Sequence, residues 1–210
     1  MRHKRKFLRY LIGCTAALSL ASCSSPDSQA SRGVKEPGRH SVPFVYPLPL
    51  VAMEDPLVLD FDLPPQRKGG SDSLVVGLRI DGESRLASGE IARAVASADV
   101  ATQISLEKIG DASTRPIPLV RWDPRPNQPS EIVEVVDGHV AGISRFDMDW
   151  VSMREAGLVE PDYTRRHLGF AWAQAAKPGR YRLSIQINRA PNELERIPSE
   201  LLVAYAHQPK

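Results

Sequence analysis

The sequence predicts an all-β protein, an antiparallel, jelly-roll-like β-sandwich of about eight strands with one short helix. Three observations lead to this prediction. Short segments alternate apolar and polar residues, as strands with one buried face do, and turn signals rich in Pro, Gly or Asp-Gly separate them. One segment instead repeats apolar residues with the period of a helix. A signal peptide and a flexible tether are expected to precede the sandwich.

The predicted strands follow one another along the chain. In the clearest of them, residues 181–188, the apolar side chains at every second position share one face. Asp137-Gly138 is a favoured two-residue turn and predicts a hairpin of residues 131–136 with residues 139–144. Further strands are predicted at residues 57–63, 73–80, 116–122, 167–174 and 201–206, with a proline-containing edge segment at residues 44–50.

One helix is predicted at residues 88–98, where apolar residues recur three and four positions apart. Ser88 is its expected N-cap. After a short break the helix is expected to continue toward Ile109. Residues 145–166 show no clear period and are predicted to form a long connection that holds one helical turn at residues 151–156.

The first 22 residues have the pattern of a secretory signal peptide. Five basic residues between Arg2 and Arg9 precede an apolar stretch from Leu11 to Leu20. Ten apolar residues cover only about half of a ~30 Å hydrocarbon core, so this stretch is too short to be a membrane-spanning helix. We therefore predict that the chain is cut between Ser22 and Cys23.

The residues at this cleavage site, Leu20-Ala21-Ser22-Cys23, resemble the lipobox of bacterial lipoproteins. The resemblance implies that Cys23 carries a diacylglycerol and an N-acyl chain such as palmitate, and so anchors the protein in a membrane. Ser24 follows the cysteine where retention in the inner membrane typically uses Asp, which implies the periplasmic face of the outer membrane. An ordinary cleaved signal peptide, with Cys23 incidental, is the alternative.

The segment between the cleavage site and the predicted strands has the composition of a linker. Residues 23–45 are rich in Ser, Pro, Gly and charged residues and show no apolar period. We therefore expect a lipidated flexible tether at residues 23–45 and a β-sandwich domain at residues 46–210.

Charge and cysteine content exclude several classes of function. The leader holds five of the 27 basic residues and none of the 25 acidic ones, so the mature chain has a net charge of −3. No basic excess remains to suggest a nucleic-acid partner. Cys14 lies in the leader and Cys23 is the expected lipidation site. An internal disulfide, a cysteine nucleophile and a thiolate zinc site are therefore excluded.

Two short clusters are candidates for binding. Arg165-Arg166-His167 could bind an anion such as phosphate or lipid A through guanidinium contacts. Asp147 and Asp149, beside Trp150 and upstream of Asp162, could hold a sugar or a calcium ion, but the glycine and glutamate of a calcium loop are missing. We predict no metal site, no cofactor and no catalytic residue. A candidate partner surface therefore consists of Arg165, Arg166, Asp147 and Asp149, with solvated loops as the alternative.

Several structural segments together resemble a family of small bacterial lipoproteins, domain of unknown function 5625. The resemblance rests on Lys177–Leu183 and Pro191–Leu194, on the strands at residues 59–63 and 74–80, and on Ile109-Gly110 leading to Pro116–Leu119. It covers residues 57–210 and implies a tethered lipoprotein domain without assigning any catalytic residue.

The leading hypothesis is a non-enzymatic, membrane-anchored periplasmic lipoprotein whose β-sandwich binds a partner, such as a periplasmic protein. One alternative is an immunity lipoprotein that neutralises a secreted antibacterial toxin, by analogy of size and location. The other is a hydrolase acting on the cell envelope, which would require a pocket with converging groups of perturbed pKa.

Overall fold

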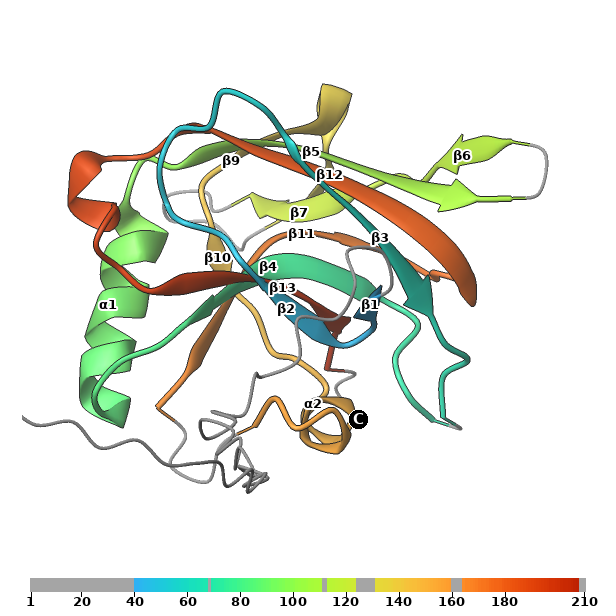
Figure 1. Ribbon diagram of the computed structural model, residues 1–210, viewed down its shortest axis with the longest axis horizontal. Helices are drawn as coiled ribbons and strands as arrows, with labels where there is room; N and C mark the ends of the chain where they lie inside the picture. The colour runs from blue at the N-terminus through green and yellow to red at the C-terminus, as the bar shows by residue number, and fades with distance from the viewer. Residues whose placement is uncertain (1–39, 68, 111–112, 124–130, 160–163, 208–210) are drawn as a thin grey trace, which may run out of the picture. The chain divides into compact units, whose positions relative to one another are not determined.

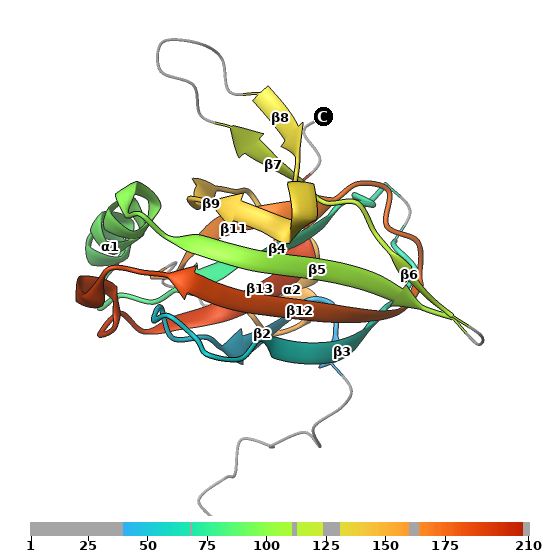
Figure 2. The ribbon, with the colours of Figure 1, turned by 90° about the horizontal axis from the view of Figure 1, so that it is seen from above.

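Two β-sheets face each other in the computed structural model (Figures 1 and 2), so the predicted all-β sandwich is confirmed. All strand pairs are antiparallel except one short parallel pair at an edge. The structure describes residues 40–67, 69–110, 113–123, 131–159 and 164–207.

The first sheet has the order β1-β3-β12-β5-β6, with β9 paired to β5 as well. Its strands are β1 (His40–Ser41), β3 (Leu57–Leu63), β5 (Ala101–Ile109), β6 (Thr114–Pro116), β9 (His139–Ala141) and β12 (Gly179–Arg189). The second sheet has the order β2-β13-β4-β11-β7-β8, with β10 paired to β11. Its strands are β2 (Phe44–Pro47), β4 (Leu74–Ile80), β7 (Val120–Asp123), β8 (Glu131–Glu134), β10 (Ser144–Arg145), β11 (Arg166–Ala173) and β13 (Ser199–Tyr205).

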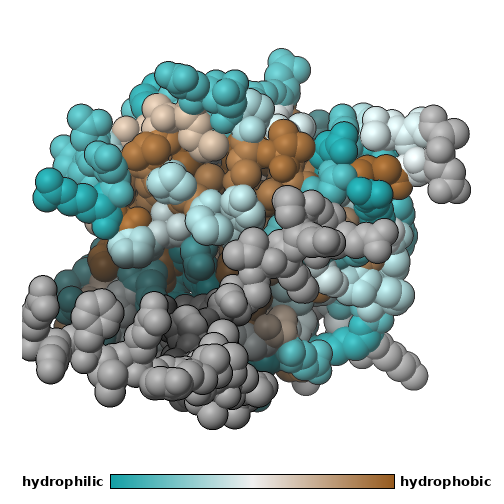
Figure 3. All heavy atoms as spheres, viewed as in Figure 1, coloured by the Kyte–Doolittle hydropathy of each residue, from teal (hydrophilic) through white to brown (hydrophobic). Residues whose placement is uncertain are grey.

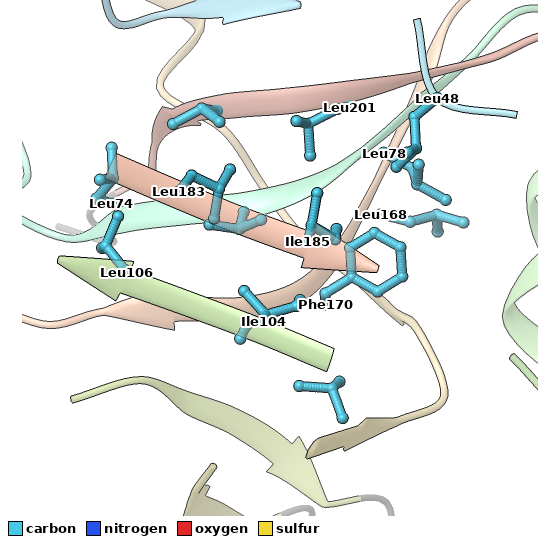
Figure 4. Close-up of a cluster of buried hydrophobic side chains, with 14 of the residues drawn as sticks. Leu48, Leu74, Leu78, Ile104, Leu106, Leu168, Phe170, Leu183, Ile185 and Leu201 are labelled. Carbon is cyan, nitrogen blue, oxygen red and sulfur yellow. The ribbon is translucent and has the colours of Figure 1, made fainter. Parts of the chain in front are cut away.

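The main core lies between the two sheets. In β12 the alternation seen in the sequence places Leu183 and Ile185 inward, where both are fully buried. Figure 4 shows these side chains pointing toward Leu78, Phe170 and Leu201 of the opposite sheet. All five belong to one buried cluster. Burial of large apolar side chains between the sheets is the main source of stability.

A second, smaller hydrophobic cluster lies on the outer face of the second sheet. Val75 and Leu202 point outward there, and both are fully buried beneath Met148 and Met153 of the segment that covers the sheet. Strands β4 and β13 are therefore buried on both faces, whereas strict alternation predicts one polar face. Figure 3 shows another part of the surface, where hydrophilic residues gather over the 3₁₀ helix η2 (Asn192–Leu194).

The helix α1 (Arg85–Ser97) begins earlier than the sequence predicts. Its N-cap is Ser84, whose hydroxyl accepts a hydrogen bond of 3.1 Å from the backbone N–H of Ala87. Ser88, the predicted N-cap, lies inside the helix, fully buried. The capping prediction was wrong because two serines four residues apart offer the same local signal.

The predicted continuation of the helix toward Ile109 was also wrong. The chain forms β5 there, a central strand of the first sheet between β12 and β6. Thr102, Ile104 and Leu106 point inward, and Gln103 and Ser105 are exposed. This alternation was present in the sequence and is typical of a half-buried strand.

Asp137-Gly138 does not form the predicted hairpin. Strand β8 pairs with β7, and β9 pairs with β5 of the other sheet. The two residues form the 3₁₀ turn η1 (Val136–Gly138), in which both have positive φ, and the chain crosses there from one sheet to the other. The turn signal was correct, but its flanking strands have other partners. Figure 2 shows the hairpin of β7 and β8 extending away from the sandwich.

Part of the predicted tether belongs to the sandwich. Residues 40–45 include β1 and the start of β2, and Phe44 is buried against Phe61 with a ring-centroid distance of 5.5 Å. The domain therefore includes residues 40–45, before the predicted boundary at residue 46.

The helical turn predicted at residues 151–156 is confirmed as α2 (Trp150–Glu155), a second short helix. No helix in the described part of the chain is long and apolar enough to cross a membrane.

Candidate functional site

A cavity of about 540 Å³ opens between α1, the segment that follows β10, and the first residues of β11. Helix α1 packs against β4 and β11 at the end of the sandwich (Figure 1). Strand β10 pairs with β11, which places Arg145 opposite Leu168. Three segments distant in sequence therefore form the walls of one cavity, here called the arginine pocket.

Five arginines line this pocket. Arg85 and Arg93 come from α1, where a spacing of eight residues places them on one helix face. Arg145 comes from β10, Arg166 is the first residue of β11, and Arg165 directly precedes that strand. A guanidinium stays charged at any physiological pH, so the pocket carries a dense positive charge.

The five arginines differ in the partners they have within the part of the chain that the structure describes. Arg85, Arg93 and Arg145 form no ion pair with any residue that the structure describes. Arg166 donates from Nη2 to the backbone carbonyl of Arg85 over 3.1 Å. Arg165 lies 3.7 Å from Asp81, the longest ion pair among those measured. Arg85, Arg93 and Arg145 therefore bring positive charge to the pocket without a carboxylate partner among the described residues.

His167 lies beside these arginines and is largely buried. Its burial, and then the charges of Arg79, Arg165 and Arg166, lower its pKa to about 4. The imidazole is therefore neutral at pH 7. Its Nε2 atom has no hydrogen-bond partner among the described residues. The ring also contacts Trp150 edge-to-face, with ring centroids 5.6 Å apart.

Two further side chains complete the wall. Among the described residues that line the arginine pocket, Asp147 is the acidic one, and it is exposed. Its carboxylate has no hydrogen-bond or ion-pair partner among the described residues. Trp150, the first residue of α2, lines the same cavity with 38% of its surface exposed. The described lining thus combines arginines with one carboxylate and with the aromatic side chains of Phe146, Trp150 and His167.

Of the four residues predicted as a partner surface, the structure brings three together. Asp147, Arg165 and Arg166 all line the arginine pocket. Asp149 does not, because its carboxylate is 2.8 and 3.0 Å from Nη2 of Arg67 and also accepts a hydrogen bond from the backbone N–H of Val151. Asp149 is nearly buried and serves as the N-cap of α2. Asp149 therefore has a structural role at the start of α2 and is not among the residues that line the arginine pocket.

The lining of the pocket limits its chemistry. No Ser, Thr, Cys, Lys or Tyr is among the described residues that line it. His167 makes no hydrogen bond to Asp147, so these two residues do not form an acid–base pair. Among the described residues, no group of three or more His, Cys, Asp or Glu side chains could hold a metal ion. The arrangement is suited to electrostatic binding of an anion.

Cys23 and Ser22 lie outside the described residues, as does Asp162.

No protein-family model matches the chain. No curated protein matches it either. Among solved structures, a protein of Sulfurospirillum deleyianum is similar at 11% sequence identity and a TM-score of 0.44, over 80% of this chain and 98% of its own. The function proposed below rests on the residues of the pocket and on the amino-terminal sequence.

Acidification is expected to destabilise the protein through His167. The folded-state pKa of about 4 lies below the ordinary histidine pKa of 6.5, so between these values the unfolded chain binds the proton more readily. The contribution to stability is complete above pH 6.5 and is lost as pH falls toward 4, by about 2–3 kcal/mol in all. Urea unfolding from pH 7 to pH 4 measures this change, with His167→Gln as the non-titrating control. An equal fall in the unfolding free energy of the unaltered protein and of His167→Gln would contradict the prediction.

Proposed function

We propose that this protein is a membrane-anchored periplasmic lipoprotein whose β-sandwich binds an anionic ligand in the arginine pocket. The lipobox-like residues before Cys23 support the anchor and a place at the outer membrane. The sequence resemblance to the lipoprotein family named above supports the same class. The pocket supports the binding activity, and no catalytic step is part of the proposal.

The observation that carries the binding proposal is the convergence of five arginines, three of which (Arg85, Arg93 and Arg145) form no ion pair with any described residue. Like charges held close together repel one another, so such a cluster opposes folding unless something of opposite charge is bound. Guanidinium groups bind phosphate and carboxylate oxygens with paired hydrogen bonds. An anion entering the pocket would therefore gain contacts and relieve repulsion together.

Binding is favoured over hydrolysis for this pocket. A hydrolase of the cell envelope would need a nucleophile or an activated water beside a base. The described lining offers Asp147 and a neutral His167 that is not hydrogen-bonded to it. With a pKa of about 4, His167 is a weak base at neutral pH. The same residues need no rearrangement to attract an anion.

Inorganic phosphate and sulfate are the simplest probes of this proposal. We expect both to bind the purified protein in isothermal titration calorimetry, and to bind less well as the salt concentration rises. Arg145→Gln or Arg166→Gln should each weaken binding by about tenfold, because a hydrogen bond to a charged group contributes roughly 1.5 kcal/mol or more.

Arg180→Gln is the matched control, since Arg180 is an exposed arginine of β12 that pairs with Asp60 outside the pocket. Its anion affinity should equal that of the unaltered protein. Absence of any binding at millimolar anion, or an equal loss in Arg180→Gln, would refute the proposal.

A further inference from the structure

The geometry points to a phosphorylated saccharide as the ligand of the arginine pocket, an inference that rests on the proposed anion binding. Three features of the pocket argue for this chemical class. These are its volume, the carboxylate of Asp147 and the indole of Trp150 in its wall. Each fits a ligand that is larger than a small inorganic anion.

The volume exceeds what an inorganic anion needs. Cavities of roughly 300–1,000 Å³ hold entire small organic molecules, and the arginine pocket has about 540 Å³. Its arginines are also spread over three segments, α1, β10 and the start of β11. A phosphate held by two or three of them leaves room for a ring-sized group beside it.

The number of donors favours phosphate over carboxylate as the anionic group. Each guanidinium presents five N–H donors, and five arginines line the pocket. A carboxylate has two oxygens, whereas a phosphate monoester has three terminal oxygens and a charge close to −2 at pH 7. The richer acceptor satisfies more of the donors and neutralises more of the charge.

Asp147 argues for a second, uncharged part of the ligand. Its exposed carboxylate would repel a bare phosphate, yet it lies in the same wall as the arginines. An ionised carboxylate only accepts hydrogen bonds, so its natural partners are hydroxyl or amino groups. A sugar ring supplies several such donors at a fixed distance from its phosphate.

Trp150 supplies a surface for the ring itself. Trp150 lines the pocket and is 38% exposed, although an exposed tryptophan leaves apolar area in contact with water. Its contact with His167 restricts the orientation of the indole. The C–H face of a pyranose is apolar and matches an indole face in size, while its hydroxyl edge remains available to Asp147.

Calorimetry with four compounds tests the inference on the full protein: glucose 1-phosphate, inorganic phosphate, glucose and glucuronate. We expect glucose 1-phosphate to bind at least tenfold more tightly than phosphate, and glucose and glucuronate to bind more weakly than either. Trp150→Ala and Asp147→Asn should each reduce the ratio of the glucose 1-phosphate affinity to the phosphate affinity. Arg180→Gln should leave that ratio unchanged.

Two further ligands, lipid A and adenosine monophosphate, test whether the phosphorylated sugar belongs to a lipid and whether a nucleotide binds instead. Vesicles containing lipid A, a phosphorylated disaccharide on a membrane, are compared with free glucose 1-phosphate, and tight binding of either supports the inference. Equal affinity for phosphate and glucose 1-phosphate would overturn it while leaving anion binding intact. Tighter binding of adenosine monophosphate than of glucose 1-phosphate would also overturn it. If no anion binds at all, the proposed function itself fails.

Discussion

Replacing Cys23 with serine is expected to move this protein from the membrane fraction to the soluble fraction and to abolish its labelling with palmitate. A serine hydroxyl cannot take the thioether-linked diacylglycerol that the lipobox-like sequence implies for this position. Each buried CH₂ of an acyl chain contributes about 0.8 kcal/mol to membrane binding, and stable anchoring needs more than one chain. Loss of the thiol therefore removes the whole anchor.

Cell fractionation and radioactive palmitate in a producing bacterium measure this effect. Cys14→Ser is the matched control, because Cys14 lies within the apolar stretch of the leader. The control should remain labelled and membrane-bound. Identical behaviour of the unaltered protein and Cys23→Ser, whether both are labelled or neither is, would contradict the lipoprotein prediction.

Phe44→Ala is expected to destabilise the domain by about 3–5 kcal/mol, which is the cost of removing a buried phenylalanine and leaving a cavity. Phe44 lies where the predicted tether, residues 23–45, overlaps the predicted edge segment, residues 44–50, and within a flexible tether such a change would have no effect. In the structure its ring is buried between His40, at a centroid distance of 4.7 Å, and Phe61 at 5.5 Å. Loss of these contacts weakens both sheets, since β2 and β3 belong to different ones.

Urea unfolding of the purified protein gives the difference in unfolding free energy. Ser41→Ala is the control from the same segment, because Ser41 is exposed and a surface change of this kind alters stability by less than about 0.5 kcal/mol. Equal midpoints for Phe44→Ala and Ser41→Ala would show that the amino-terminal strands do not contribute to the sandwich.

Strands with one exposed face could be predicted well from the sequence. In β3 and β12 every second residue meets water, so the pattern alone gives both the strand and its inner face. In β4 the inner face was predictable, but Val75 and Arg79 are buried by a segment some seventy residues later in the chain. No local pattern contains that information, because it depends on which part of the chain covers the sheet.

The arginine pocket could be predicted only in part, for a similar reason. Arg165 and Arg166 adjoin in sequence, and Asp147 stands out in an acidic cluster. The helix predicted from the sequence begins at Ser88 and therefore does not include Arg85. Arg85 and Arg93 both belong to α1 and are exposed. Their approach to β11 follows from how α1 packs at the end of the sandwich.

The two walls of the arginine pocket belong to separately packed parts of the molecule. Arg85 and Arg93 are carried by α1, whose buried residue Val95 joins the main core. Asp147 and Trp150 are carried by the segment of Met148 that closes the outer cluster. A ligand bound to both walls would link α1 to the segment of Met148. Saturating the pocket with ligand should therefore raise the melting temperature of the protein and slow hydrogen exchange first in the segment of Met148.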